Sequence, residues 1–431
     1  MKYMKSGKFW GSIRKCSPAL FLALTVLIPS FAAAEETEPG AILLEAARVF
    51  DGKNIRTDVA LLVKDGKVAR VGSRESIQLE NVKVIDLGDA TVLPGFIELH
   101  AHLSFQNVPA ETVLKHGITT VRDLGGPVHK PYGGKGSLRV LTSGPIITAP
   151  GGYPIPNLGS SNIAIAVSSV EEARKTVRDL VSGGAVIIKI ALEPGGEAGA
   201  PWFSSHGHGN HNPPAEHGNL HRPPAHKDLH LKQNWPLLPE PIIKAIVDEA
   251  HKNNRKVTAH VAEEKGVQLA INSDVDEWAH VPCDAIPEAL LKQAVAKKVK
   301  IVTTLDTLSK CQGVAQNSAA WQLLGGEFLY GAEIAHPDIP WGIDAQELIH
   351  MTQMAKMESM DALHAATSNA GQHLGLPLLG TLQPGAPADI IAVKGDPRHN
   401  FKLLEYPDLV ISGGEIIVNN FCDPAPILFY D

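Results

Sequence analysis

The hydrophobic and polar positions along the chain divide it into two β-rich ends and a longer middle part. In the N-terminal part, the apolar runs 59–63 and 68–71 flank the turn Lys64-Asp65-Gly66, a pattern typical of a β-hairpin. The C-terminal part repeats this pattern with short apolar runs at 388–393, 409–411 and 415–418. Two β-rich ends around a different middle indicate one small β-sandwich, assembled from residues 35–92 and 372–431.

The middle part, residues 93–371, alternates short apolar runs with segments of helical periodicity. Candidate strands begin near Leu93, Ile118, Leu138, Ala185, Lys256, Val275, Val299 and Phe328. Helical segments separate most of them, for example 170–182, 240–253, 285–298 and 344–357. This alternation predicts an α/β fold, a (β/α)8 TIM barrel. A doubly wound open sheet is the alternative, but it would need a glycine-rich phosphate motif after its first strand, where this chain has histidines.

The first 34 residues have the pattern of a secretory signal peptide. Basic residues such as Arg14 and Lys15 precede an apolar run from Pro18 to Phe31, and small residues follow up to Ala34. This order predicts cleavage near Ala34 and a mature protein that is periplasmic or secreted. The apolar run is short for a transmembrane helix, and we expect no membrane association after cleavage.

Composition and charge narrow the classes of partner. The 431 residues are 44% hydrophobic and 20% charged, with a formal net charge of -7, and only 5% are aromatic. An acidic chain with few aromatic residues disfavours nucleic-acid binding. Signal cleavage leaves Cys283, Cys311 and Cys422, an odd number, and an oxidising compartment would permit a Cys283–Cys311 disulfide.

Candidate chemistry gathers at the predicted carboxyl ends of the strands, where TIM barrels place their active sites. His100 and His102 end the first strand, and residues i and i+2 of a strand point to one face, so their imidazoles should converge. The other strand-end candidates are Lys189, His260, His280 and Glu333. Each alone could be a packed or capping residue; together they predict a metal centre.

The chain resembles the amidohydrolase superfamily, in particular its imidazolonepropionase-like and prolidase-like exported members. The motifs that carry the resemblance lie at 94–102, 117–125, 247–252, 362–367 and 380–390. The resemblance implies a (β/α)8 barrel with a β-sandwich from both chain ends, in agreement with the pattern above.

The resemblance also implies roles for the strand-end residues. His100 and His102 would bind the more buried of two divalent ions, usually zinc. Lys189, carboxylated by CO₂ to a carbamate, would bridge both ions, and His260 and His280 would bind the second. A hydroxide bridging the two ions would be the nucleophile, and the strand-eight carboxylate, here Glu333, would bind metal and transfer protons.

Three positions depart from the family pattern. Relatives carry aspartate where this chain has Glu333 and usually where it has Glu98, so both carboxylates are one methylene longer here. A displacement near 1 Å can cost about a hundredfold in rate, so either change could alter the activity. Tyr153 stands where many relatives place a histidine, and it is a candidate substrate contact, with loop packing as the alternative.

A histidine-rich insertion follows the fourth strand. Residues 204–232 are rich in Gly, Asn and Pro, and they contain His206, His208, His211, His217, His221, His226 and His230. Without apolar periodicity the segment cannot bury a core of its own. It would either gather metal over the active-site end of the barrel or serve as a solvated spacer.

Three functions follow from these observations. The first is an exported metal-dependent amidohydrolase that hydrolyses a C–N bond in a small-molecule amide, small peptide or cyclic amide. The second is a lactonase or other ester hydrolase with the same metals. The third is a non-catalytic protein that binds or stores metal through its histidine-rich loop. The sequence leaves open whether the protein forms a homo-oligomer.

Overall fold

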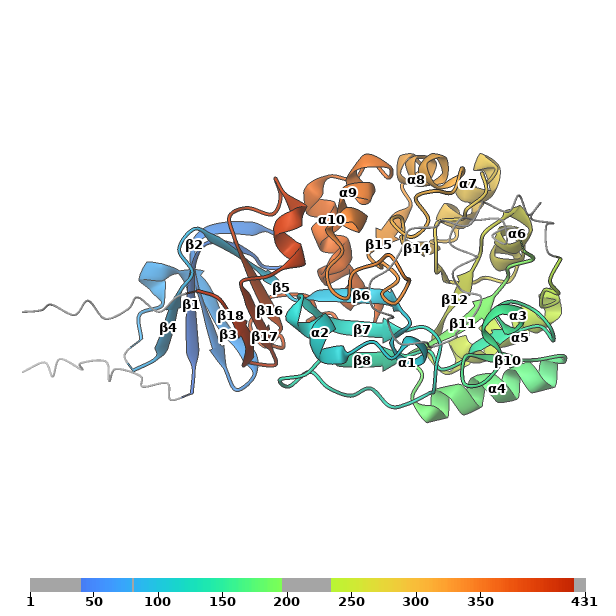
Figure 1. The fold of residues 1–431 in the computed structure, drawn as a ribbon, viewed down its shortest axis with the longest axis horizontal. Helices are drawn as coiled ribbons and strands as arrows, with labels where there is room; N and C mark the ends of the chain where they lie inside the picture. Colours follow the sequence, from blue (N-terminus) through green and yellow to red (C-terminus); the bar gives the residue numbers. More distant parts are fainter. Residues whose placement is uncertain (1–39, 80, 196–233, 422–431) are drawn as a thin grey trace, which may run out of the picture. The chain divides into compact units, whose positions relative to one another are not determined.

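The computed structural model describes residues 40–79, 81–195 and 234–421, and the described residues all belong to one unit. Their strands form one mixed sheet and two parallel sheets (Figure 1).

Strands from both chain ends make up the mixed sheet. From the N-terminal part come β1 (Ile42–Phe50), β2 (Ile55–Lys64), β3 (Lys67–Ser73), β4 (Lys83–Asp86) and β5 (Ala90–Pro94). From the C-terminal part come β16 (Ile390–Lys394), β17 (Leu409–Ser412) and β18 (Glu415–Asn419). The order is β18-β17-β16-β5-β1-β2-β3, with β4 paired to β1, and β5 and β16 join the two chain ends in an antiparallel ladder. The predicted assembly from both ends is present as a single hydrogen-bonded sheet; a two-layer sandwich stays a prediction.

The parallel strands follow the chain order, except that β10 (Ala164–Ala166) lies at the sheet edge beside β9 (Ile146–Thr148). One sheet is β6 (Phe96–Ala101), β7 (Ile118–Asp123) and β8 (Arg139–Thr142). The other, in spatial order, is β10, β9, β11 (Ile187–Ala191), β12 (Lys256–His260), β13 (Glu277–Trp278), β14 (Lys300–Val302) and β15 (Glu327–Leu329). A parallel bridge between Ala101 and Ile334 connects the end of β6 to the segment after β15. Complete closure of the barrel by strand pairing stays a prediction.

Two details of the predicted strands are wrong, and glycines explain both. Leu93 belongs to β5 in the mixed sheet, and the barrel strand β6 begins after Gly95. A Cβ at Gly95 would lie 2.2 Å from the Thr119 side chain, so only glycine allows this crossing between sheets. The third strand is split into β8 and β9 around Gly144, whose φ of +69° breaks the strand.

Helices lie between the parallel strands and after the last of them. They are α1 (Leu103–Gln106), α2 (Ala110–Lys115), α3 (Ile155–Leu158), α4 (Val170–Gly183), α5 (Glu240–Lys252), α6 (Glu264–Asn272), α7 (Glu288–Ala296), α8 (Val314–Leu323), α9 (Ala345–Gln353), α10 (Ser359–Ala366) and α11 (Ser368–His373). In α4, the Ser169 side chain accepts a hydrogen bond from the Glu172 amide at the N-terminus, and Ala173, Val177 and Leu180 form its buried face. Their spacing is why the sequence predicted this helix.

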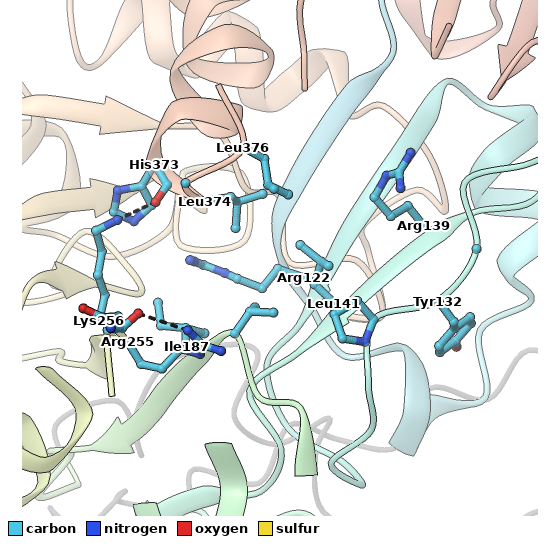
Figure 2. A pocket seen from close by; sticks show the side chains of 15 residues that line it. Arg122, Tyr132, Arg139, Leu141, Ile187, Arg255, Lys256, His373, Leu374 and Leu376 are labelled. Atoms are coloured by element: carbon cyan, nitrogen blue, oxygen red, sulfur yellow. Dashed lines mark hydrogen bonds between the residues drawn. The ribbon is translucent and has the colours of Figure 1, made fainter. Parts of the chain in front are cut away.

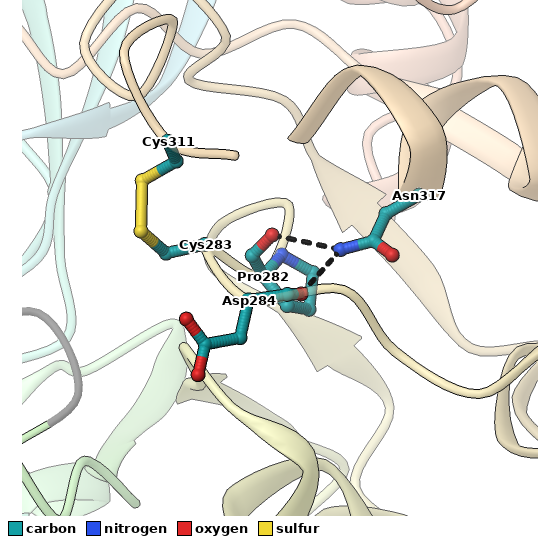
Figure 3. The surroundings of a disulfide bond; sticks show 5 residues. All are labelled: Pro282, Cys283, Asp284, Cys311 and Asn317. Atoms are coloured by element: carbon teal, nitrogen blue, oxygen red, sulfur yellow. Dashed lines mark hydrogen bonds between the residues drawn. A yellow bond between two sulfur atoms is a disulfide. The ribbon is translucent and has the colours of Figure 1, made fainter. Parts of the chain in front are cut away.

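Cys283 and Cys311 form a disulfide with a Cα–Cα distance of 5.0 Å, which links the segments that follow β13 and β14 (Figure 3). Across the described residues, no helix has both the length and the apolar content needed to cross a bilayer.

Candidate metal centre

The two histidines at the end of β6 converge. Their Nε2 atoms lie 3.3 Å apart, and the Nε2 of His102 lies 3.7 Å from a carboxylate oxygen of Glu333. One ligand atom from each of these three residues lies within 4.8 Å of the others. His100, His102 and Glu333 therefore form a compact group that could hold one metal ion.

Three other predicted residues surround this group. The Lys189 ammonium on β11 lies 3.4 Å from the Nε2 of His100. The ring of His280, just after β13, lies 4.4 Å from that of His100 and 4.7 Å from that of His260 at the end of β12. The structure thus brings all six predicted residues together at the carboxyl ends of the strands, while their roles as metal ligands stay predictions.

Glu333 reaches the group from an unusual backbone conformation. Its φ is +67°, in the left-handed region that residues other than glycine rarely adopt, and strain of this kind is concentrated at functional sites. Burial opposes ionisation of the carboxyl group, but its hydrogen bond with His102 and the nearby His280 outweigh burial and hold the pKa of Glu333 well below its usual value. The direction of this shift favours the carboxylate form of Glu333 beside the histidines.

The hydrogen bonds of the histidines fit a metal. The Nδ1 of His100 lies 2.8 Å from the carbonyl oxygen of Ala279, which can only accept, so Nδ1 carries the proton and Nε2 presents a lone pair. The Nδ1 of His280 is bonded to the Thr304 hydroxyl at 2.8 Å, which leaves its Nε2 as the nitrogen for a metal. Burial, reinforced by Lys189, holds the pKa of His100 well below its usual value, and burial also lowers that of His280. Neutral, buried imidazoles oriented in this way are the form that binds divalent ions.

Tyr153 covers the same space from the loop after β9. Its ring stacks on His260 at 4.7 Å and on Trp235 at 5.5 Å between centroids. With Lys189, His102, His260, His280 and Glu333 it lines a cavity of about 30 Å³, room for one or two water-sized species. Both interpretations of Tyr153, substrate contact and packing, are compatible with this position.

The histidine-rich insertion, with His206, His208, His211, His217, His221, His226 and His230, lies outside the described residues.

Three residues that support the site had no assigned role in the sequence analysis. The Glu98 carboxylate accepts hydrogen bonds from the amides of His100 at 2.7 Å and Ala332 at 2.9 Å, and so ties β6 to the segment that carries Glu333. Asp123, at the end of β7, accepts from the amides of Leu103 and Ser104, directly after His102. Thr304, after β14, orients His280. Applying the strand-end rule to β7 and β14 would have found Asp123 and Thr304.

The chain matches known proteins over most of its length. The sequence model of the amidohydrolase family matches residues 91–417. The ochratoxinase of Aspergillus niger is 24% identical, over 84% of this chain and 82% of its own length. The crystal structure of that enzyme superposes with a TM-score of 0.68 at 20% identity, covering 89% of this chain and 97% of the other. The structure of a prolidase complexed with N-methylphosphonate-L-proline superposes with a TM-score of 0.68 at 21% identity, covering 88% of this chain and 100% of the other. The structure of a Xaa-Pro dipeptidase with bound methionine superposes with a TM-score of 0.66 at 20% identity, covering 87% of this chain and 99% of the other. These similarities show a TIM-barrel-type fold.

Proposed function

The chain belongs to the amidohydrolase family, and on that premise we propose that it is an exported, metal-dependent hydrolase of a C–N bond in an amide, small peptide or cyclic amide. The observation that carries the proposal is the convergence of four histidines, one lysine and one carboxylate at the carboxyl ends of the parallel strands, where all of them except His100 line one cavity. The names of its relatives, ochratoxinase, prolidase and Xaa-Pro dipeptidase, support amide or peptide substrates.

The residues divide between two ion positions. His100, His102 and Glu333 would hold one ion, and His260 and His280 the second. Lys189, as a carbamate, would supply an oxygen to each. When bound, two divalent ions, which we expect to be zinc, would supply the acidified bridging hydroxide that the resemblance implies and polarise the scissile carbonyl.

The protein side chains would then transfer the proton and position the substrate. The ionised Glu333 carboxylate can accept a proton from the attacking water and return it to the leaving nitrogen. Glu98 accepts hydrogen bonds from the amides of His100 and Ala332 and so holds the segment of Glu333 beside β6. Tyr153 lies beside His260, where a substrate would lie over the second ion position.

Two observations support export. The first 34 residues have the pattern of a cleaved signal peptide. The Cys283–Cys311 disulfide is of a kind that persists in oxidising compartments such as the periplasm.

Metal analysis combined with activity assays tests the proposal. The mature protein is assayed on Xaa-Pro dipeptides, cyclic amides and lactones at high and low bicarbonate. We expect about two divalent ions per chain and hydrolysis of an amide substrate. Lys189→Ala and Glu333→Ala should each lower the rate at least about a hundredfold with the circular dichroism spectrum unchanged. Lys292→Ala, an exposed position on α7, is the matched control.

Other outcomes would replace the proposal. Hydrolysis of lactones without amides would assign a lactonase with the same residues. Bound metal with no turnover across the panel would assign a metal-binding protein. A full rate in Glu333→Ala would remove this carboxylate from the mechanism.

A further inference from the structure

A larger cavity, of about 420 Å³, lies at the opposite ends of the parallel strands (Figure 2). Arg139, Ile187 and Lys256, which line it, are the first residues of β8, β11 and β12. His260 of the candidate metal centre is the last residue of β12, about 13 Å from Lys256 along the strand. The two cavities are therefore separate sites, and a volume of this size is within the range of small-molecule pockets.

The lining of this cavity is cationic. Its charged side chains, leaving His373 aside, are Arg122, Arg139, Arg255 and Lys256, and no described residue that lines it is acidic. Two of these charges are balanced by carboxylates that do not themselves line the cavity. Arg122 pairs with Glu277 at 2.6 Å, and Arg139 pairs with Asp389 at 3.1 Å.

The other two cations are not balanced in this way. Arg255 donates only to backbone carbonyls, from Nε to Ala185 at 2.8 Å and from Nη1 to Asn254 at 3.1 Å. The Lys256 ammonium donates to the carbonyl oxygen of His373 at 2.5 Å. Among the described residues, no carboxylate lies within ion-pair distance of either. Two adjacent residues thus bring to the cavity two positive charges that form no direct ion pair with a described carboxylate.

The surroundings of Lys256 disfavour its positive charge. Burial lowers the pKa of Lys256, against the opposing effect of Glu277 and Asp276. An anion in the cavity would oppose this lowering of the Lys256 pKa, because an opposite charge within about 4–6 Å favours the charged form of a lysine.

Aliphatic side chains make up much of the rest of the lining, which also includes Tyr132 and Asn254. In Figure 2, Leu374 and Leu376 lie on one side of the Arg122 side chain, and Leu141 and Ile187 lie on the other. A ligand for such a cavity needs an apolar body for these side chains and one anionic end for the two cations.

We propose that this cavity binds a small aliphatic carboxylate, with its carboxylate on Arg255 and Lys256 and its hydrocarbon chain on the leucines. The site is independent of the metal centre and of the reaction proposed for it.

Isothermal titration of the mature protein with octanoate, and with octanamide as a neutral match, tests the proposal. We expect saturable binding of octanoate and none of octanamide at the same concentration. In the double variant Arg255→Met/Lys256→Met the affinity should fall at least about tenfold, because both charges are removed and the apolar stems stay. Lys292→Met on α7 should bind octanoate as the wild type does.

A second variant separates this cavity from the metal centre, to which a carboxylate could also bind. His102→Ala should retain octanoate binding. Loss of binding in His102→Ala with retention in the double variant would overturn the proposal, as would equal binding of octanamide or no binding up to about 10 mM. If the double variant does not fold, the single variant Lys256→Met replaces it, because it keeps the hydrogen bonds from Arg255 to backbone carbonyls. An octanoate affinity of Lys256→Met equal to that of the wild type would also overturn the proposal.

Discussion

At the scale of single residues, the buried carboxyl group of Glu347 on α9 makes stability depend on pH. Burial is the main cause that raises the pKa of Glu347 from 4.5 to about 8, although the Asp306 amide donates to it at 2.7 Å. Between pH 4.5 and about pH 8, the Glu347 carboxyl group of the folded protein keeps a proton that it has lost in the unfolded chain. The stabilising contribution of this group is thus complete below pH 4.5 and declines as pH rises to 8, by up to about 1.4 kcal/mol per pH unit.

Replacing this carboxyl group by an amide should weaken the pH dependence. Glu347→Gln keeps the hydrogen-bond acceptor and is neutral at every pH. Between pH 5.5 and 7.5 we expect the wild type to lose up to about 3 kcal/mol more unfolding free energy than the variant, measured by urea titration. Asp344, whose pKa burial raises to about 7, titrates in both proteins and adds its own pH dependence to each. Glu288→Gln, exposed at the start of α7, should follow the wild type; equal slopes in all three proteins would contradict the assignment.

At the scale of elements, the Cys283–Cys311 disulfide fixes two segments beside the candidate metal centre. Cys283 follows His280 by three residues, and Cys311 lies beyond Thr304, which orients His280. The disulfide closes a loop with a sequence separation of 28, for which chain entropy predicts about 3–4 kcal/mol of stabilisation. The segments after β13 and β14 are therefore tied where both contribute to the site.

Removing this disulfide should lower thermal stability. We expect Cys283→Ser/Cys311→Ser to unfold several degrees below the wild type in a calorimetric scan, because its unfolded chain is less constrained. Dithiothreitol should lower the transition of the wild type and leave that of the variant unchanged. A variant that unfolds at the same temperature as the oxidised wild type would show that the disulfide contributes nothing to thermal stability.

The sequence predicted elements better than their connections. Periodicity identified α4, and the pair His100 and His102 located the end of β6, because both signals lie within a few adjacent residues. The split of the third strand and the transfer of Leu93 to the mixed sheet depend on how glycines fit against distant neighbours such as Thr119. Such contacts have no local signature.

At the scale of the whole molecule, the same limit applies to networks that join distant residues. Arg122 and Glu277 are 155 positions apart, yet they form a buried ion pair that His373 completes at 2.6 Å. Neither this network nor the cationic cavity beside it could be read from the sequence, because no spacing rule relates their members. The grouping of the candidate metal ligands was predictable because the barrel itself supplies a rule, the carboxyl ends of its strands.

That rule makes metal removal a test of the whole molecule. The candidate ligands come from β6, β11, β12, the segment after β13 and the segment after β15, so a bound ion would connect strands far apart in the sequence. Anything that binds only the folded state stabilises it, by about 2.7 kcal/mol at a hundred times the dissociation constant. For a chain of this size we expect chelation to lower Tm by roughly 3 °C and added zinc to restore it.

Two variants locate the stabilising ion. In His102→Ala the zinc-dependent shift should fall, since one ligand of the compact group is lost. In His399→Ala, where the imidazole is exposed and far along the chain from the site residues, the shift should equal that of the wild type. A full shift in His102→Ala would place the stabilising zinc elsewhere in the chain. The deletion of residues 204–232 would then show whether the histidine-rich insertion holds it, because only zinc bound there is lost with that segment.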